Sequence, residues 1–169
     1  MLAGIYLFSV LFYRFHMRKP GTYIKNIIHI DDDEEDFLML QEAIREVHSD
    51  AEVFFLSECP SLVGSPRYPA PDMIFLDINM HGNDGFYWLE KIRGKGHTNL
   101  PIIMYSTAST EHYIHKAYSM GADLFFIKPH TFQELVESVR SILSLDWKAP
   151  ATITRAHFHE GKYRPFRLN

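Results

Sequence analysis

Short apolar runs recur along the chain at residues 27–30, 53–56, 73–76, 102–105 and 124–127. Each run is about four residues long, and its positions are apolar on both faces, with His29 as the polar exception in the first. This pattern is typical of parallel strands that helices cover on both sides. The sequence therefore predicts five buried strands.

Helical patterns lie between these runs. The clearest begins at Thr131, which forms a capping box with Glu134 ahead of an apolar stripe that ends at Leu143. Similar spacing predicts helices over residues 35–48, 85–93 and 111–120, the last stopped by Gly121. Residues 57–72 contain four prolines and a glycine, so a helix there is limited to one or two turns.

Alternating strands and helices predict an open, doubly wound α/β domain over residues 26–147. Residues 1–25 are then an N-terminal extension, and residues 148–169 a basic, irregular C-terminal tail that contains no output domain. In such folds a ligand binds beyond the carboxyl ends of the strands. The residues that follow each strand are therefore the candidates for function.

Polar side chains follow four of the five predicted strands. They are Asp31 and Asp32, Asp77 and Asn79, Ser106, and Lys128. Carboxylates that converge in one pocket repel one another unless a cation offsets them, and oxygen ligands favour Mg²⁺. One carboxylate is then free to attack phosphorus, while a lysine and a hydroxyl bind the phosphoryl oxygens.

Four segments in this order resemble the receiver domains of two-component response regulators, the CheY-like superfamily. The segments read IIHIDDD at 27–33, DMIFLDINM at 72–80, PIIMYSTA at 101–108, and GAD at 121–123 followed by KP at 128–129. The resemblance covers residues 26–147 and implies a flavodoxin-like parallel sheet with strand order 2-1-3-4-5.

The resemblance also assigns the catalytic and metal-binding roles. It implies that Asp77 is the phosphoacceptor and that Lys128 binds the phosphoryl group. Mg²⁺, or alternatively Mn²⁺, would bind directly to Asp32, to Asp77 and to the backbone carbonyl of Asn79, and to Asp31 through water. The domain would catalyse only its own phosphorylation and dephosphorylation.

Output is implied by the same resemblance. Ser106 would be the switch hydroxyl and Phe125 the switch aromatic, although an aromatic residue in a strand is also an ordinary core residue. The expected phosphodonor is a histidine kinase or a histidine phosphotransfer protein, and the receiver of the signal is an unknown downstream protein. Two departures from the family pattern are His81, where proline is usual, and Thr107, where a smaller residue is usual.

Charge limits the remaining partners. Residues 26–148 carry 20 acidic and 9 basic side chains, a net charge of −11, so no nucleic-acid partner is expected.

The N-terminal segment has two explanations. Residues 1–13 are mostly apolar and precede Arg14, Arg18 and Lys19. The segment is either an extension outside the fold, with Met17 as the true start, or a membrane-surface contact of residues 1–19. The single cysteine fits a cytoplasmic protein. We expect a monomer or a phosphorylation-dependent dimer.

Two other functions stay open. One is a pseudo-receiver that binds partners without phosphorylation, against which Asp32, Asp77 and Lys128 argue. The other is a phosphatase with an aspartyl nucleophile, which needs a second acid where this chain has Asn79. The acids from Asp33 to Asp36 also have a simpler explanation, as negative charge at a helix N-terminus.

Overall fold

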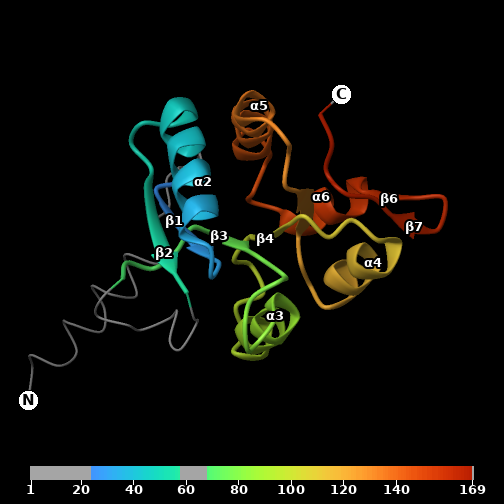
Figure 1. Cartoon of the computed structure of the whole chain (residues 1–169). Helices are drawn as coiled ribbons and strands as arrows, with labels where there is room; N and C mark the ends of the chain where they lie inside the picture. Colours follow the sequence, from blue (N-terminus) through green and yellow to red (C-terminus); the bar gives the residue numbers. More distant parts are fainter. Residues whose placement is uncertain (1–23, 58–67, 169) are drawn as a thin grey trace, which may run out of the picture.

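The computed structural model describes residues 24–57 and 68–168 (Figure 1). Five strands form one parallel sheet in the order β2-β1-β3-β4-β5, as predicted. They are β1 (Asn26–Ile30), β2 (Glu52–Leu56), β3 (Met73–Leu76), β4 (Ile102–Ser106) and β5 (Leu124–Ile127). The order reverses between β1 and β3, which places the switch point at the carboxyl ends of these two strands.

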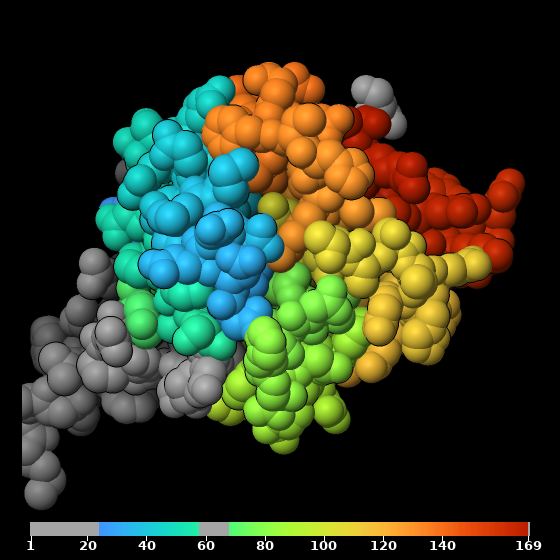
Figure 2. Space-filling view, in the orientation of Figure 1, coloured from blue at the N-terminus to red at the C-terminus, as the bar shows by residue number. Residues whose placement is uncertain are grey.

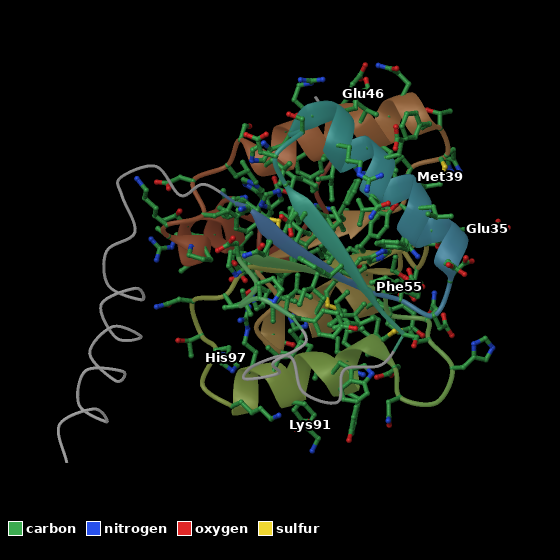
Figure 3. All side chains as sticks on the ribbon, turned by 90° about the vertical axis from the view of Figure 1, so that its left-hand side faces the viewer. Glu35, Met39, Glu46, Phe55, Lys91 and His97 are labelled. Atoms are coloured by element: carbon green, nitrogen blue, oxygen red, sulfur yellow. The ribbon has the colours of Figure 1, made fainter. Side chains whose placement is uncertain are left out.

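Helices cover both faces of this sheet. They are α2 (Glu34–Val47), α3 (Gly85–Gly94), α4 (Glu111–Ser119) and α5 (Phe132–Leu143). Figure 1 shows α2 and α5 on one face and α3 and α4 on the other. Figure 3 looks onto the β2 edge, with α2 marked by Glu35, Met39 and Glu46 on one side of the sheet and α3 marked by Lys91 on the other.

Alternate strand residues enter two separate cores. Ile27, Phe75 and Ile103 pack under α2 and α5, whereas their neighbours Ile28 and Ile74 pack over α3 and α4. All five are fully buried. This double burial explains why the strands read as continuous apolar runs rather than as alternating ones.

Side chains cap the helices where the sequence predicts helix starts. Asp33 and Thr131 are the N-caps of α2 and α5, and each accepts hydrogen bonds from backbone N–H groups of the first turn. Gly121 follows the end of α4 with a φ of 96°, a conformation that favours glycine at this position.

The expectation of an irregular tail is wrong for the described part of residues 148–169. This segment forms the helix α6 (Pro150–Ala156) and the antiparallel pair β6 (Phe158–His159) and β7 (Lys162–Tyr163). The two short strands are too brief to leave a periodic signal, and Ile153 of α6 is buried in the core beneath α5. The tail is therefore part of the folded domain.

Some expectations lie outside the described residues. These are the extension before residue 24, with its possible membrane contact, and most of the proline-rich segment 57–72. Among the residues that the structure describes, no helix has the length and apolar character needed to span a membrane.

Candidate functional site

Asp77 lies at the carboxyl end of β3, at the switch point of the sheet. Its side chain is almost fully buried, and its backbone N–H donates to the carbonyl of Ile30 at the end of β1. The carboxylate accepts a hydrogen bond from the backbone N–H of Asn79 at 2.5 Å. Burial raises the pKa of Asp77 above its ordinary value, and the nearby Lys128 ammonium offsets only part of this rise.

Lys128 connects the acids of the site. Its Nζ lies 3.0 Å from Asp77 Oδ1, 2.9 Å from Asp31 Oδ2 and 2.6 Å from Asp36 Oδ2. Burial alone would lower the pKa of Lys128, but these carboxylates, with Asp77 first among them, raise it, so the ammonium stays charged. The Nζ also lies 5.0 Å from the ring centroid of Tyr105, within range of a cation–π contact.

Asp31 is held at the end of β1 by its neighbours. Its Oδ2 lies 3.3 Å from Nε2 of the fully buried His29, and its Oδ1 accepts from the Asp33 backbone N–H. Burial opposes ionisation, but the contacts with His29 and Lys128 lower the pKa of Asp31 to about 2. Asp31 is therefore ionised, and its carboxylate forms an ion pair with the Lys128 ammonium.

Asp32 points toward the loop after β3. It is exposed, and its Oδ2 accepts from the His81 backbone N–H at 2.7 Å and also contacts Nδ1 of the His81 ring. The hydrogen bond from the His81 backbone, followed by that from the ring, lowers the pKa of Asp32. The family's usual proline could make neither the backbone bond nor the ring contact, so His81 gives this carboxylate a partner specific to this chain.

Ser106 ends β4 beside the loop that carries Asn79. Its hydroxyl lies 3.4 Å from Asn79 Nδ2 and 3.3 Å from the Ala108 backbone N–H, and the residue is fully buried. Phe125 lies on the neighbouring strand β5, paired in register with Met104, and it is also fully buried. The structure thus places the two expected switch residues on adjacent strands.

The donor set fits a hard cation that retains water. Asp32 and Asp77 would supply carboxylate oxygens and Asn79 a carbonyl, and Mg²⁺ typically uses one or two carboxylates together with water. Within the described ranges, no group of three or more His, Cys, Asp or Glu side chains is arranged to hold a metal ion by itself. A cation here would therefore depend on backbone and water ligands, and Asp32 would have to exchange its contact with His81.

Sequence reasoning missed two members of the site. The sequence suggests that Asp36 is one acid of a solvated run, yet it binds Lys128 from the first turn of α2. Tyr105 reads as a core residue, yet its ring lies under the ammonium. Tyr105 directly precedes Ser106, so both residues lie at the same end of β4. This position is the signal in the sequence that could have identified Tyr105.

Comparison with known proteins agrees with this geometry. The family model described as "Response regulator receiver domain" matches residues 27–140. The sensory transduction protein BceR of Halalkalibacterium halodurans is 32% identical over 117 residues, which cover 69% of this chain and 49% of BceR. PcoR of Escherichia coli, a transcriptional regulatory protein, is 26% identical over 77% of this chain and 56% of PcoR. The chain thus spans about half the length of these curated relatives.

Solved structures show the same fold. The response regulator RPA3017 of red-light signalling in R. palustris has a TM-score of 0.63 and 27% identity, covering 70% of this chain and 91% of RPA3017. The Mn²⁺-bound response regulator Rcp1 has a TM-score of 0.62 and 22% identity, covering 73% of this chain and 94% of Rcp1.

The doubly wound sheet and its buried aspartate at the switch point define an α/β domain of the flavodoxin-like class. This chain belongs to the response regulator receiver domain family of two-component systems.

Proposed function

We propose that this receiver domain accepts a phosphoryl group on Asp77 from a histidine kinase or a histidine phosphotransfer protein. The observation that carries the proposal is the buried Asp77 carboxylate, held between the Lys128 ammonium at 3.0 Å and the Asn79 N–H at 2.5 Å. These two donors fix the orientation of the carboxylate, and a pre-oriented nucleophile is what an in-line transfer requires.

The transfer step forms one bond and breaks another. A carboxylate oxygen of Asp77 attacks phosphorus, the P–N bond of the donor phosphohistidine breaks, and its electron pair leaves with the imidazole nitrogen. Lys128 then pairs with the phosphoryl oxygens, and the Ser106 hydroxyl donates a hydrogen bond to one of them. The domain thus catalyses its own phosphorylation and, with water as nucleophile, its own dephosphorylation.

Mg²⁺ is the proposed cofactor, with Mn²⁺ as an alternative. Asp32, Asp77 and the Asn79 carbonyl would hold the ion, and Asp31 would bind through water. When bound, the ion neutralises charge on the transferring phosphoryl group. The carboxylate and carbonyl donors support this choice, and the similar regulator Rcp1 was crystallised in a Mn²⁺-bound form.

Signalling is proposed to pass through protein–protein contacts in the cytoplasm. The net charge of −11 over residues 26–148 supports a protein rather than a nucleic-acid partner. Ser106 and Phe125 are the proposed switch residues. The single-domain organisation expected from the sequence stays a prediction, as does the choice between a monomer and a phosphorylation-dependent dimer.

Intact-mass measurement after treatment with acetyl phosphate and Mg²⁺ tests the assignment. We expect one added phosphate that hydroxylamine removes, and no addition on Asp77→Asn. Asp146→Asn is the control, because Asp146 is an exposed acid that follows the C-terminal end of α5 and should leave the addition intact. An equal addition on Asp77→Asn would refute Asp77 as the acceptor, and no addition on the native chain would favour a pseudo-receiver.

A further inference from the structure

The outer edge of β5 is covered by a side chain of α4 and by the C-terminal segment. Phe125 pairs with Met104 of β4 but directs its own backbone groups to the other side. Its N–H donates to the Tyr118 hydroxyl at 3.1 Å, and its carbonyl accepts from the Phe166 N–H at 2.7 Å. A free strand edge is a template for pairing with another chain, so these two bonds close it.

The Tyr118 hydroxyl joins three segments. While it accepts from Phe125, it donates to the carbonyl of Arg164 at 3.1 Å. The buried Tyr118 ring stacks on Tyr163 of β7, with centroids 4.6 Å apart and an interplanar angle of 17°. One side chain of α4 therefore contacts both β5 and the C-terminal segment.

Several further contacts hold residues 150–166, which we term the strap, against the domain. Phe166 forms an isolated parallel bridge with Phe126, and their rings meet edge to face at 5.8 Å. Lys162 pairs with Glu111 of α4 at 2.7 Å. Figures 1 and 2 show this segment lying alongside α4, with α5 bordering it as well. The strap is thus an ordered strip of chain rather than a solvated tail.

The strap turns on a tight hairpin. Glu160 and Gly161, which separate β6 from β7, both have positive φ angles, 52° and 77°. Two such residues form the turn that matches the twist of antiparallel strands. This turn fixes the direction in which residues 162–166 return along α4 toward β5.

The strap also lies on a short route from the phosphorylation site. Lys128, which contacts Asp77, donates its backbone N–H to the carbonyl of Ser106, and Ser106 pairs in register with Ile127. The two proposed phosphoryl-binding groups therefore end the paired strands β4 and β5. A displacement of this end toward Asp77 would shift Phe125, whose carbonyl accepts from Phe166 of the strap and whose N–H donates to Tyr118 of α4.

We propose that the strap is an autoinhibitory cover of the β5 edge, and that phosphorylation of Asp77 releases it by displacing Phe125. The link between phosphorylation and release of the strap rests on the proposed function of Asp77. The state in which the strap covers the β5 edge rests on the strap contacts alone. Release would free the β5 edge and the adjoining side of α4 for an extended segment of a downstream protein, which would take the place of Phe166.

Amide exchange of the full chain tests both halves of the proposal, with the Phe125 and Phe166 N–H groups as probes. With Mg²⁺ and beryllofluoride, a phosphoryl mimic, we expect both amides to exchange at least tenfold faster, and we expect no change on Asp77→Asn. Fluorine NMR establishes whether beryllofluoride is bound. Bound mimic with unchanged or slower exchange would overturn the release, whereas unbound mimic together with no phosphate addition would overturn the proposed function.

A variant pair tests the strap without phosphorylation. Tyr118→Phe removes the hydroxyl that links Phe125 to Arg164 but keeps the ring stack. Tyr163→Phe is the matched control, because the Tyr163 hydroxyl has no hydrogen bond among the described residues. We expect Phe166 exchange to be at least tenfold faster in Tyr118→Phe than in the control. Equal rates would overturn the strap as a cover held by Tyr118.

Coupling must also run in the opposite direction. A variant that loosens the strap favours the released state, so it should tighten the binding of the phosphoryl mimic. We expect Tyr118→Phe to bind beryllofluoride several-fold more tightly than Tyr163→Phe in a titration followed by fluorine NMR with Mg²⁺ present. Equal or weaker binding would overturn the coupling.

Discussion

The residues of the site differ in how far their positions could be predicted from the sequence. The strand-end positions of Asp77, Lys128 and Ser106 could be predicted because each directly follows a recognisable strand or ends one, whereas their roles stay predictions. His81 could be identified as unusual, but its bond to Asp32 depends on how the loop after β3 folds back toward β1. A contact across 49 residues of chain leaves no local pattern in the sequence.

The His81 contact leads to a prediction about metal affinity. The ring competes with a cation for the same Asp32 oxygen, so His81→Ala should bind Mg²⁺ several-fold more tightly. Isothermal titration calorimetry measures the affinity. His97→Ala, which removes a histidine between α3 and the start of β4, at the end of the sheet opposite the site, should leave it unchanged. Weaker binding by His81→Ala would show instead that the ring contributes to the metal site.

A second prediction concerns the charge on Asp77 itself. Because burial raises the folded-state pKa of Asp77 above its unfolded value, its ionised form destabilises the metal-free protein. This destabilisation begins as pH rises above the unfolded-state pKa and is complete above the folded-state pKa. Asp77→Asn should therefore increase the free energy of unfolding at pH 7 by about 1 kcal/mol. Near pH 3 both chains are uncharged at this position, so the difference should disappear.

Urea unfolding with a chelator present at both pH values measures this difference. The exposed Asp146→Asn is the control and should show no comparable gain at pH 7. A gain that persists unchanged at about pH 3 would assign the effect to packing rather than to charge.

At the scale of elements, the sequence predicts regular structure well and irregular connections poorly. The five strands and the four helices α2 to α5 lie within two residues of their predicted bounds, because each strand is a continuous apolar run and each helix carries a periodic apolar stripe. The tail was misjudged because β6 and β7 have only two residues each and because α6 has no side-chain cap. Its order depends on contacts with α4 and β5, which a local pattern cannot show.

The start of α3 gives a prediction at this scale. A Cβ on Gly85 would lie 2.1 Å from the backbone oxygen of Asp77, so the helix can approach the phosphorylation loop only without a side chain there. Gly85→Ala should cost roughly 3 kcal/mol or more, since backbone atoms must move. Gly94→Ala in the same helix meets no atom within 4 Å and should be neutral or slightly stabilising.

Thermal unfolding of both variants measures these costs. Equal stabilities would show that the loop after Asp77 moves freely to accept a methyl group. In that case Gly85→Ala should also leave phosphorylation by acetyl phosphate unaffected, because the loop would not be tied to α3.

At the scale of the whole molecule, the two ends of the sheet differ in how firmly they are held. Arg93 of α3 fastens the end opposite the site: its guanidinium binds the carbonyls of Gly121 and Leu100 and lies 2.7 Å from Asp123 Oδ2. The same Asp123 oxygen accepts from the Ile102 N–H. These bonds join α3 to the starts of β4 and β5, so motion of these strands is concentrated at their carboxyl ends, where Ser106 and Lys128 lie.

This network yields the last prediction. Burial alone raises the pKa of Asp123 and lowers that of Arg93, so each charge depends on the other for compensation. Arg93→Met should cost about 3–5 kcal/mol by leaving Asp123 buried without its partner, and adding Asp123→Asn should recover part of that cost. A urea-unfolding double-mutant cycle measures the coupling, with the exposed Glu111–Lys162 pair as a control expected to give a much smaller coupling. If the buried and exposed pairs gave equal coupling, Arg93 would not be the anchor at this end, and motion on phosphorylation would spread along the full length of β4 and β5.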